Sequence, residues 1–248
     1  MSSLGQRLKI KIGMESEKER KKRIAREKKE RDKHKIYNEK VRNPKTKPDK
    51  EITTAEFKSI FFKEATSYFL EMNRQFVVDE SNKTFLKWIS LYFTNNLDFE
   101  TETNGELRKG LLVYGNCGSG KSSVFDIIQN ISLKYNLKHL WFKNISVHDV
   151  ITDYNINGEE IVKRLTKGNI HFDDLGTEKL ANSWGVREKL MGRILEIRYN
   201  NFKKYGIKTF VTTNLSIEEI KEYYGVRVAD RLYELFNFIE LTGNSRRF

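Results

Sequence analysis

Apolar residues recur at helical spacing in two segments that follow residue 50. The first helical face consists of Phe57, Ile60, Phe61, Tyr68, Phe69 and Met72, and Thr53 precedes it with Glu56 at capping-box spacing. The second face consists of Phe85, Trp88, Ile89, Tyr92 and Phe93. Helical spacing alone accounts for these aromatic residues as core positions. The pattern therefore predicts leading helices within residues 53–95, and the polar residues 95–108 predict a loop.

From Lys109 onward, short apolar runs alternate with helical patterns. The runs predict strands at residues 111–114, 139–142, 169–172, 208–211 and 238–241. The helical stretches lie near residues 122–135, 159–167, 186–203 and 216–234. Strands that are buried on both faces and separated by helices are typical of parallel sheets. The pattern predicts a three-layer α/β domain over residues 51–248, including the leading helices.

Positive charge is concentrated at the start of the chain. Residues 1–50 contain 19 Lys and Arg against 8 Asp and Glu, so they carry +11 of the total net charge of +12. Pairs four residues apart, such as Glu17 with Lys21, favour a helix, yet no apolar stripe could dock that helix on a core. Pro44 and Pro48 follow in a Lys-rich stretch that is typical of a linker. We interpret residues 1–50 as a basic N-terminal arm, helical or disordered, that binds a partner.

The sequence lacks the features of a secreted or membrane protein. It has no apolar run of about 18 residues and no secretory signal at its beginning. Its single cysteine, Cys117, cannot form an internal disulfide and fits a reducing compartment. We expect a cytoplasmic protein without a membrane contact.

A glycine-rich loop follows the first predicted strand and precedes a predicted helix. The loop consists of Gly115, Asn116, Cys117, Gly118, Ser119, Gly120, Lys121 and Ser122, followed by Ser123. Glycines let backbone amides surround phosphate oxygens, and the helix directs its amide-rich N-terminus at the same anion. Lys121 is expected to reach the β- and γ-phosphates of ATP, and Ser122 to ligate Mg²⁺. The loop has the form of a Walker A motif and predicts an ATP-binding site.

Two carboxylates follow the third predicted strand. In a P-loop ATPase, one carboxylate contacts the metal and another orients the attacking water. Asp173 is our candidate for the first role and Asp174 for the second. A strand-exit turn could also contain Asp-Asp-Leu-Gly, but its position after a P-loop in a βα array favours the functional interpretation. His171 lies mid-strand, where a packed histidine is expected rather than a catalytic one.

Three further polar residues are candidates for catalysis. Asn214 ends the fourth predicted strand and would position the water, although an asparagine there could also belong to the N-cap region of the next helix. Arg227 and Arg231 lie four residues apart on one helical face. Arginine suits stabilisation of a transferring phosphate in a neighbouring subunit. Two solvated surface arginines are the alternative.

With these residues identified, residues 80–248 resemble the DnaC-type replicative helicase loaders of the AAA+ superfamily and the related IstB transposition ATPases. The marks are LLVYGNCGSGKSS, NIHFDDLGTE, FVTTNLS and the final YGVRVADRLYELFNFIELTGNSRRF. The resemblance implies the sheet order 5-1-4-3-2, no C-terminal helical lid, and Arg231 as the arginine finger with Arg227 beside it. It leaves the second sensor arginine open, with Arg246 as a candidate nucleotide contact. Asp174 replaces the glutamate of many AAA+ proteins, which implies slow turnover.

The resemblance implies a loader that hydrolyses ATP at a site shared between subunits and binds single-stranded DNA and a hexameric replicative helicase. The basic arm could dock on an acidic helicase surface, contact DNA, or serve as a solubilising tail. Family members place DNA-contacting residues between the second and third strands, here residues 143–168. The charges of Lys163, Arg164 and Lys167 in that segment equally suit a solvated helix face.

Two other functions remain as alternatives. An IstB-like transposition helper ATPase usually has a compact apolar N-terminal domain, and residues 1–50 are too hydrophilic for one. A P-loop small-molecule kinase would have an arginine-rich lid, which is not evident, and the pair of Arg227 and Arg231 argues against it. A guanine-specific GTPase is disfavoured because no Asn-Lys-x-Asp motif occurs.

Overall fold

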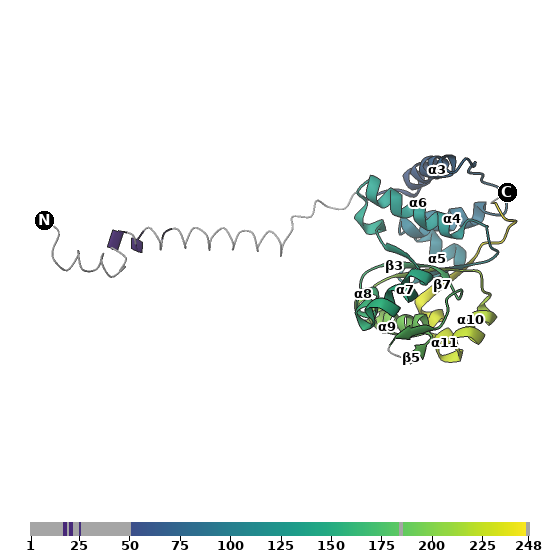
Figure 1. The fold of residues 1–248 in the computed structure, drawn as a ribbon. Coiled ribbons are helices and arrows are strands. Elements are labelled where there is room, and N and C mark those ends of the chain that lie inside the picture. Colours follow the sequence, from purple (N-terminus) through teal and green to yellow (C-terminus); the bar gives the residue numbers. More distant parts are fainter. Residues whose placement is uncertain (1–16, 19, 22–24, 26–50, 184–185, 247–248) are drawn as a thin grey trace, which may run out of the picture. The chain divides into compact units, whose positions relative to one another are not determined.

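The structure is a computed structural model that describes residues 17, 18, 20, 21, 25, 51–183 and 186–246. The chain divides into two compact units, Met1–Asp49 and Lys50–Phe248. The described residues of the first unit are helical (Figure 1), and the rest of the predicted arm and its linker lie outside the described residues. The sheet and the candidate site belong to the second unit.

Three helices precede the sheet. Helix α3 (Thr54–Glu71) begins at the predicted capping box, where the Thr53 hydroxyl accepts from the Glu56 amide and the Glu56 carboxylate accepts from the Thr53 amide. Helix α4 (Lys83–Phe93) follows as predicted. The predicted loop 95–108 is partly wrong, since it contains helix α5 (Asp98–Thr103). Phe99 of this short helix is fully buried against the ring of Tyr92, which gives a polar segment an apolar anchor.

Five parallel strands form the main sheet: β1 (Gly110–Tyr114), β2 (Lys143–Ser146), β3 (Ile170–Leu175), β6 (Thr209–Thr213) and β7 (Phe236–Glu240). Their order is β2-β3-β6-β1-β7. The predicted order 5-1-4-3-2 is therefore confirmed. Because β6 pairs in parallel with both β3 and β1, the carboxyl ends of these three strands lie side by side at one edge of the sheet.

Helices cover both faces of the sheet, so the predicted three-layer architecture is confirmed (Figure 1). Helices α3, α4, α5 and α6 (Lys121–Lys134) pack on one face. The other face carries α7 (Val147–Asn157), α8 (Glu159–Leu165), α9 (Leu190–Tyr205), α10 (Ile217–Tyr224) and α11 (Val226–Leu235). Alternate residues of β1 serve the two cores, with Leu111 and Val113 in one and Leu112 in the other.

The predicted second strand at residues 139–142 is wrong. Residues Lys138–Leu140 form a 3₁₀ turn, and the strand begins at Lys143. Leu140 and Phe142 are buried beneath α6, which explains the apolar pattern without a strand. Strand β2 itself is half-buried and polar because it lies at the edge of the sheet and pairs only with β3. An edge strand does not require a continuous apolar run.

Several predicted helices also differ from the structure. The predicted helix 159–167 corresponds to α8, but the pattern did not predict α7, which precedes it. Gly158 (φ 58°) separates the two helices. The predicted helix 186–203 begins only at Leu190, because residues 181–183 and 186–188 form a small antiparallel pair, β4 and β5. The predicted helix 216–234 is two helices, since Gly225 (φ 90°) breaks it.

A buried arginine fastens α9 to the sheet. The side chain of Arg198 is fully buried, and burial without a carboxylate partner lowers the pKa of its guanidinium to about 9. The guanidinium donates to the carbonyl oxygens of Leu165, Gly168 and Lys208 and to the Thr209 hydroxyl, each at 2.8 Å. These acceptors lie at the amino ends of β3 and β6, opposite the edge that carries the candidate site.

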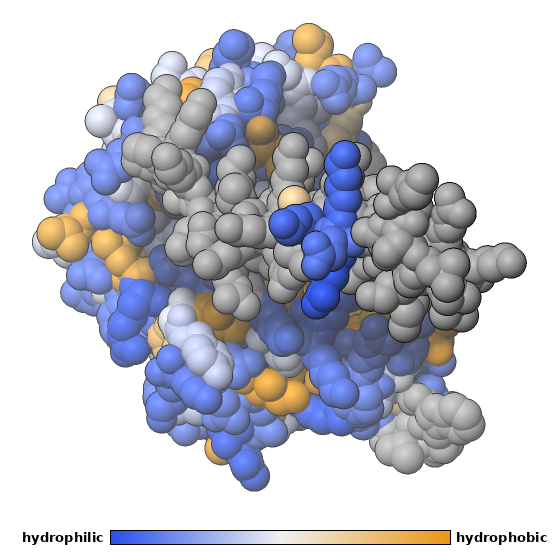
Figure 2. All heavy atoms as spheres, turned by 90° about the vertical axis from the view of Figure 1, so that its left-hand side faces the viewer, coloured by the Kyte–Doolittle hydropathy of each residue, from blue (hydrophilic) through white to orange (hydrophobic). Residues whose placement is uncertain are grey.

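Figure 2 shows a face of the molecule on which the coloured side chains are mostly hydrophilic and the hydrophobic ones are scattered in small groups. None of the helices described in the structure combines the length and apolar composition that crossing a membrane would require.

Candidate nucleotide-binding site

The glycine-rich loop joins the end of β1 to the start of α6, as predicted. Gly115 (φ 140°) packs so closely on the segment after β7 that a Cβ would lie 2.2 Å from the Leu241 carbonyl oxygen. Gly120 (φ 100°) directly precedes α6, and a Cβ there would meet nothing within 4 Å. The loop is thus closed on its β7 side and open at the helix N-terminus, where backbone amides can bind an anion.

Lys121 lies in the loop rather than in solvent, with 5% of its surface exposed. Its ammonium group donates to the carbonyl oxygens of Gly115 and Asn116 at 2.8 Å. It also donates to Asn214 Oδ1 at 2.9 Å. The structure therefore brings together the predicted phosphate-binding lysine and the predicted water-positioning residue, which are 93 positions apart in the sequence.

The predicted metal-binding residues also meet. Ser122 Oγ donates to Asp173 Oδ1 at 2.6 Å, and the hydroxyl of Thr212 donates to the same oxygen. A serine hydroxyl next to a carboxylate offers the hard oxygen atoms that Mg²⁺ prefers. The described residues contain no group of three or more His, Cys, Asp or Glu that could hold a metal ion by themselves. This donor set fits an ion whose remaining ligands are phosphate oxygens and water.

Asp174 has an uncommon backbone conformation. Its φ is 58°, and the pairing of β3 with β6 is irregular between Phe172 and Leu175. The amide of Asp174 donates to the Thr212 hydroxyl at 3.3 Å. A non-glycine residue at positive φ is costly, and such residues cluster at functional sites. Asp174 thus lies in β3 without a register partner on β6, and it lines the same cavity as Lys121 and Asn214.

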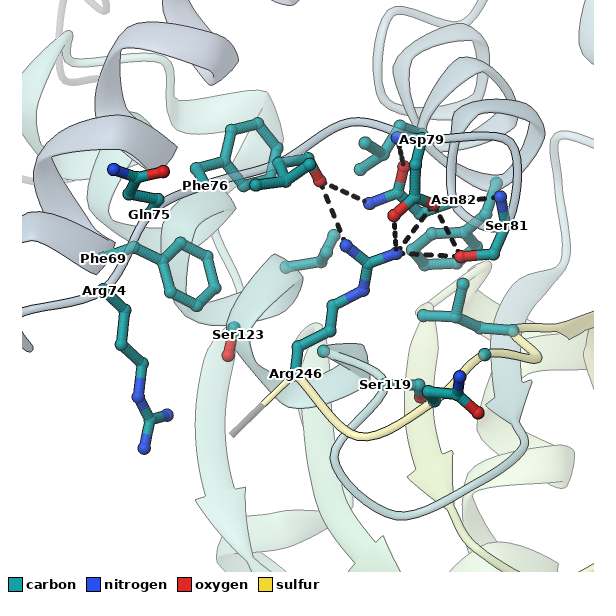
Figure 3. A pocket seen from close by; sticks show the side chains of 18 of the residues that line it. Phe69, Arg74, Gln75, Phe76, Asp79, Ser81, Asn82, Ser119, Ser123 and Arg246 are labelled. Carbon is teal, nitrogen blue, oxygen red and sulfur yellow. Dashed lines mark hydrogen bonds and ion pairs between the residues drawn. The ribbon is translucent and has the colours of Figure 1, made fainter. Parts of the chain in front are cut away.

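Two neighbouring cavities surround the loop. The smaller has a volume of about 270 Å³ and is lined by loop residues 117, 118 and 120–123 together with Asp174 and Asn214. The larger has a volume of about 990 Å³ and lies between the segment 73–82, the start of α6 and residues 243–246 (Figure 3). Both are lined by Phe69, Arg74, Gly120, Ser123 and Arg246. The pair has the size and polarity to hold phosphates in the smaller cavity and a nucleoside in the larger.

A buried hydroxyl supports a ligand at this place. Ser119 is 4% exposed and lines the larger cavity, and its Oγ has no hydrogen-bond partner among the described residues. Buried polar atoms are nearly always hydrogen-bonded, so an atom without a partner at a cavity wall indicates a missing acceptor or donor. Together with the open space at Gly120, this hydroxyl fits a bound nucleotide.

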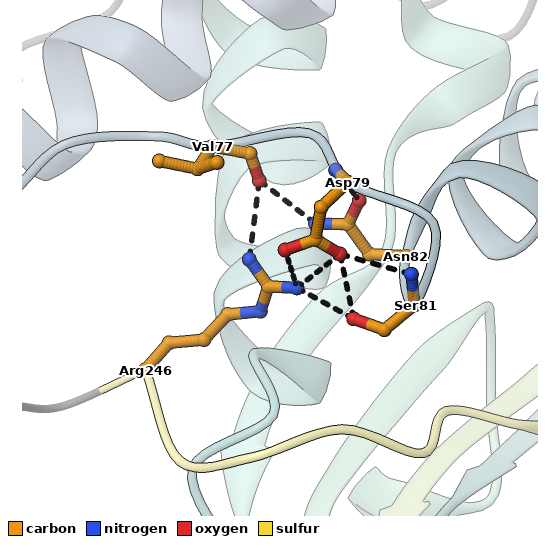
Figure 4. Close-up of polar contacts among 5 residues, drawn as sticks. All are labelled: Val77, Asp79, Ser81, Asn82 and Arg246. Atoms are coloured by element: carbon orange, nitrogen blue, oxygen red, sulfur yellow. Dashed lines mark hydrogen bonds and ion pairs between the residues drawn. The ribbon is translucent and has the colours of Figure 1, made fainter.

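The C-terminal residues lie across the loop. The Arg246 amide donates to the Gly118 carbonyl oxygen at 3.0 Å. Its guanidinium reaches the far wall of the larger cavity, where it pairs with both carboxylate oxygens of Asp79 at 2.7 and 2.8 Å and donates to Ser81 and Val77 (Figure 4). Hydrogen bonds from Ser81 and Arg246 lower the pKa of Asp79 to about 2. The predicted nucleotide contact, Arg246, thus lines both cavities while its guanidinium is held by Asp79.

The two candidate finger arginines lie away from this chain's own loop. Arg231 and Arg227 of α11 both contact Glu196 Oε1, at 2.6 and 3.3 Å. Arg231 is 24% exposed and lies over the Tyr199 ring, whereas Arg227 is 78% exposed. Neither lines the two cavities. The structure therefore does not support a role of these arginines at the nucleotide site of their own chain. Their role at the site of a neighbouring subunit stays a prediction.

His171 is packed, as the sequence analysis expected. It is fully buried, its ring stacks on Phe125 with centroids 4.1 Å apart, and Nδ1 hydrogen-bonds Asn144 Oδ1 at 2.7 Å. Burial lowers the pKa of the imidazole to about 4. The ring is therefore neutral at physiological pH and is not part of the cavities.

Sequence reasoning missed the contributions of Phe69, Arg74, Asp79 and Thr212. Thr212 lies in β6, two residues before Asn214, which directly follows that strand, and that proximity was the available signal. The segment 73–82 shows no motif, and only its packing against the loop brings it to the cavities.

The parallel sheet, with a glycine-rich loop that joins strand β1 to helix α6, defines the fold class as a P-loop NTPase. No family model matches the sequence, and no curated protein matches it either. Among solved structures, DnaI is 23% identical over 67% of this chain and 88% of its own, with a TM-score of 0.48. A candidate primosome component from Streptococcus pyogenes serotype M3 is 20% identical over 69% of this chain and 85% of its own, with a TM-score of 0.47.

The replication initiator DnaA is also similar. AMPPCP-bound DnaA from Aquifex aeolicus is 16% identical over 69% of this chain, with a TM-score of 0.46, and this chain spans 50% of its length. The neighbours expected from the sequence resemblance are thus found among the solved structures. At these identities the likeness concerns the fold alone, and the fold assignment rests on the strand order described above.

Proposed function

We propose that the chain binds Mg²⁺–ATP at the glycine-rich loop and hydrolyses it. One observation carries this proposal: Lys121 meets Asn214, and Ser122 meets Asp173, at the carboxyl ends of three adjacent strands. Nucleotides bind at this edge of open α/β sheets. The two cavities provide room for a nucleoside and its phosphates on one continuous wall.

Each residue has a separate task in the proposed reaction. The Lys121 ammonium exchanges its loop carbonyls for the β- and γ-phosphate oxygens. Asp174 accepts a proton from the attacking water, and the Asn214 amide fixes the position of that water. Ser122, and Asp173 through water, would hold Mg²⁺, which would neutralise part of the phosphate charge.

We further propose that Arg231 acts on the nucleotide of a neighbouring copy. Its guanidinium is partly exposed, and the Glu196 carboxylate holds it on the α11 surface, away from its own loop. Arg227 extends beside it and is freely accessible. A permanently charged forked donor in this position suits stabilisation of a transferring phosphate across an interface.

Mixing two inactive variants tests the shared site. Asp174→Ala removes the proton acceptor, and Arg231→Ala removes the finger, so each variant alone should hydrolyse ATP slowly. Mixed subunits contain some interfaces with both groups intact, so the mixture should recover part of the wild-type rate. If the mixture is no faster than the average of the separate variants, the site is complete within one chain.

At the level of cellular function, we propose a replicative helicase loader that binds single-stranded DNA. The basic arm supports this proposal, because +11 over residues 1–50 would release counterions from a phosphate backbone or dock on an acidic protein surface. Deleting residues 1–50 should leave ATP binding unchanged and abolish capture of the purified replicative helicase of the same cell. Retention of helicase binding would contradict the role of the arm, and capture of a transposase instead would favour an IstB-like helper ATPase.

A further inference from the structure

Arg74 directly follows the end of α3, where the backbone geometry fixes its direction. Asn73 is left-handed (φ 56°), and its amide donates to the Leu70 carbonyl oxygen at 2.9 Å. The Arg74 amide donates to the Phe69 carbonyl oxygen at 2.8 Å. These two bonds constitute a Schellman motif, a well-defined way to end a helix. The side chain of Arg74 therefore leaves the helix end in a set direction.

Aromatic packing holds the same turn in place. The rings of Phe69 and Phe76 stack with centroids 5.8 Å apart, one on each side of the turn. Phe76 also packs edge-on against Phe61 of α3, at 6.1 Å. Because Phe61 belongs to the buried core, the turn that carries Arg74 is tied to the rigid part of the domain.

Arg74 lines the smaller cavity together with Lys121, Asp174 and Asn214, and it lines the larger cavity as well. In Figure 3 its guanidinium extends below Phe69 and points away from Arg246 and Asp79. Arg74 and Lys121 thus lie on the wall of one cavity but come from different elements, the end of α3 and the start of α6.

Arg74 differs from the other arginines of residues 51–246 whose side chains are described. Those arginines make ion pairs or hydrogen bonds with Glu106, Asp153, Glu159, Glu196 or Asp79, or, for Arg198, with backbone carbonyls. The Arg74 guanidinium has no such partner among the described residues. An exposed arginine without a counter-charge at the wall of a predicted phosphate cavity is a candidate ligand-binding group.

We propose that Arg74 binds the phosphate chain of the nucleotide held by its own chain. This inference rests on the proposed function and adds a residue to it. Arginine presents a planar fork that matches two phosphate oxygens, and it keeps its charge at all physiological pH values. The Arg246 guanidinium is engaged by Asp79, so Arg74 is the guanidinium at this cavity that can bind phosphate without first breaking an ion pair.

Competition for a fluorescent ATP analogue tests the proposal, with ATP and inorganic tripolyphosphate as competitors. Tripolyphosphate lacks base and ribose, so it reports phosphate contacts alone. Arg74→Ala should weaken both competitors by about tenfold or more, the usual loss when a charge-assisted hydrogen bond is removed. Arg74→Lys should recover part of the affinity, because it keeps the charge but loses the fork.

Two controls separate this proposal from the proposed function. Arg108→Ala is the control, because it also removes one exposed arginine but lies at the amino end of β1, opposite the loop. This variant should bind both competitors as the wild type does. Lys121→Ala tests the loop itself: unchanged binding in that variant would overturn the nucleotide site. If Lys121→Ala fails to bind while Arg74→Ala binds tripolyphosphate within about twofold of wild type, the site stands and the role of Arg74 is refuted. Failure of tripolyphosphate to compete in the wild type would also refute it.

Because the Arg74 side chain makes no hydrogen bond or ion pair within the described residues, its replacement should not disturb folding. The thermal unfolding temperature of Arg74→Ala without nucleotide should equal that of the wild type. A clear decrease would mean that the side chain has a structural role, and a loss of affinity could then not be assigned to phosphate binding; this result would contradict the proposal.

Discussion

Two glycines of the same loop should differ in how strongly their replacement by alanine destabilises the fold. At Gly120 a Cβ would meet nothing within 4 Å, so the only cost to folding is the backbone conformation, with φ 100° and ψ 12°. That conformation costs an L-residue about 1–2 kcal/mol. At Gly115 the Cβ would lie 2.2 Å from the Leu241 carbonyl oxygen, and backbone rather than a side chain would have to move. Overpacking adds about 1–3 kcal/mol to a similar backbone cost.

Gly120→Ala should therefore lower the free energy of unfolding by about 1–2 kcal/mol, and Gly115→Ala by about 3 kcal/mol or more. Gly120→Ala should also weaken ligand binding. Gly120 lines both cavities, so its new methyl group would occupy the space proposed for phosphate and should weaken ATP at least about tenfold in a protein that remains folded.

Urea unfolding without nucleotide measures the first quantity, and titration of the folded variants with ATP measures the second. The reasoning is refuted if Gly120→Ala unfolds as easily as Gly115→Ala, since the space at Gly120 would then not be open. It is also refuted if Gly120→Ala binds ATP with wild-type affinity, since the cavity beside Gly120 would then not hold the phosphates.

Two further variants probe the site and the scaffold. In Asn214→Ala, Lys121 keeps its two carbonyl acceptors, so ATP affinity should change less than about threefold. The kcat of this variant should fall about tenfold to a hundredfold. A change in affinity without a change in kcat would contradict the water-positioning role. Arg198→Met removes the buried donor shared by the amino ends of β3 and β6. The free energy of unfolding, measured by urea denaturation, should fall by about 3–5 kcal/mol. A loss below about 1 kcal/mol would contradict that anchoring.

Much of the fold follows from local sequence patterns. The runs at Leu111–Tyr114 and Lys208–Val211 are apolar because their strands are buried on both faces, and such strands are visible in the sequence. Strand β2 was misplaced because Lys143–Ser146 lies at the sheet edge, where polar residues are tolerated, while the neighbouring Phe142 is buried by a helix. Breaks at Gly158 and Gly225 interrupt helical periodicity at single residues, which a periodic pattern does not resolve.

The site was predictable where chemistry requires a fixed spacing. Lys121 and Ser122 belong to a motif. Asp173 lies near the carboxyl end of β3 and Asn214 directly follows β6, and the parallel sheet brings these two strand ends to one edge. Arg74 and Asp79 have no such spacing, because they reach the cavities through a helix end and a loop whose position depends on packing against residues more than 40 positions away. The pairing of Arg246 with Asp79 spans 167 positions and has no local signal.

ATP hydrolysis by the Asp174→Asn variant, measured together with ATP binding, tests the central claim most directly. Asp174 lines the phosphate cavity, and asparagine keeps the size of its side chain, so the amide should leave ATP affinity close to wild type. Loss of the proton acceptor should lower kcat by about a hundredfold or more. Wild-type hydrolysis by this variant, or equal loss of binding and hydrolysis, would contradict the account of a P-loop ATPase in which Asp174 activates water.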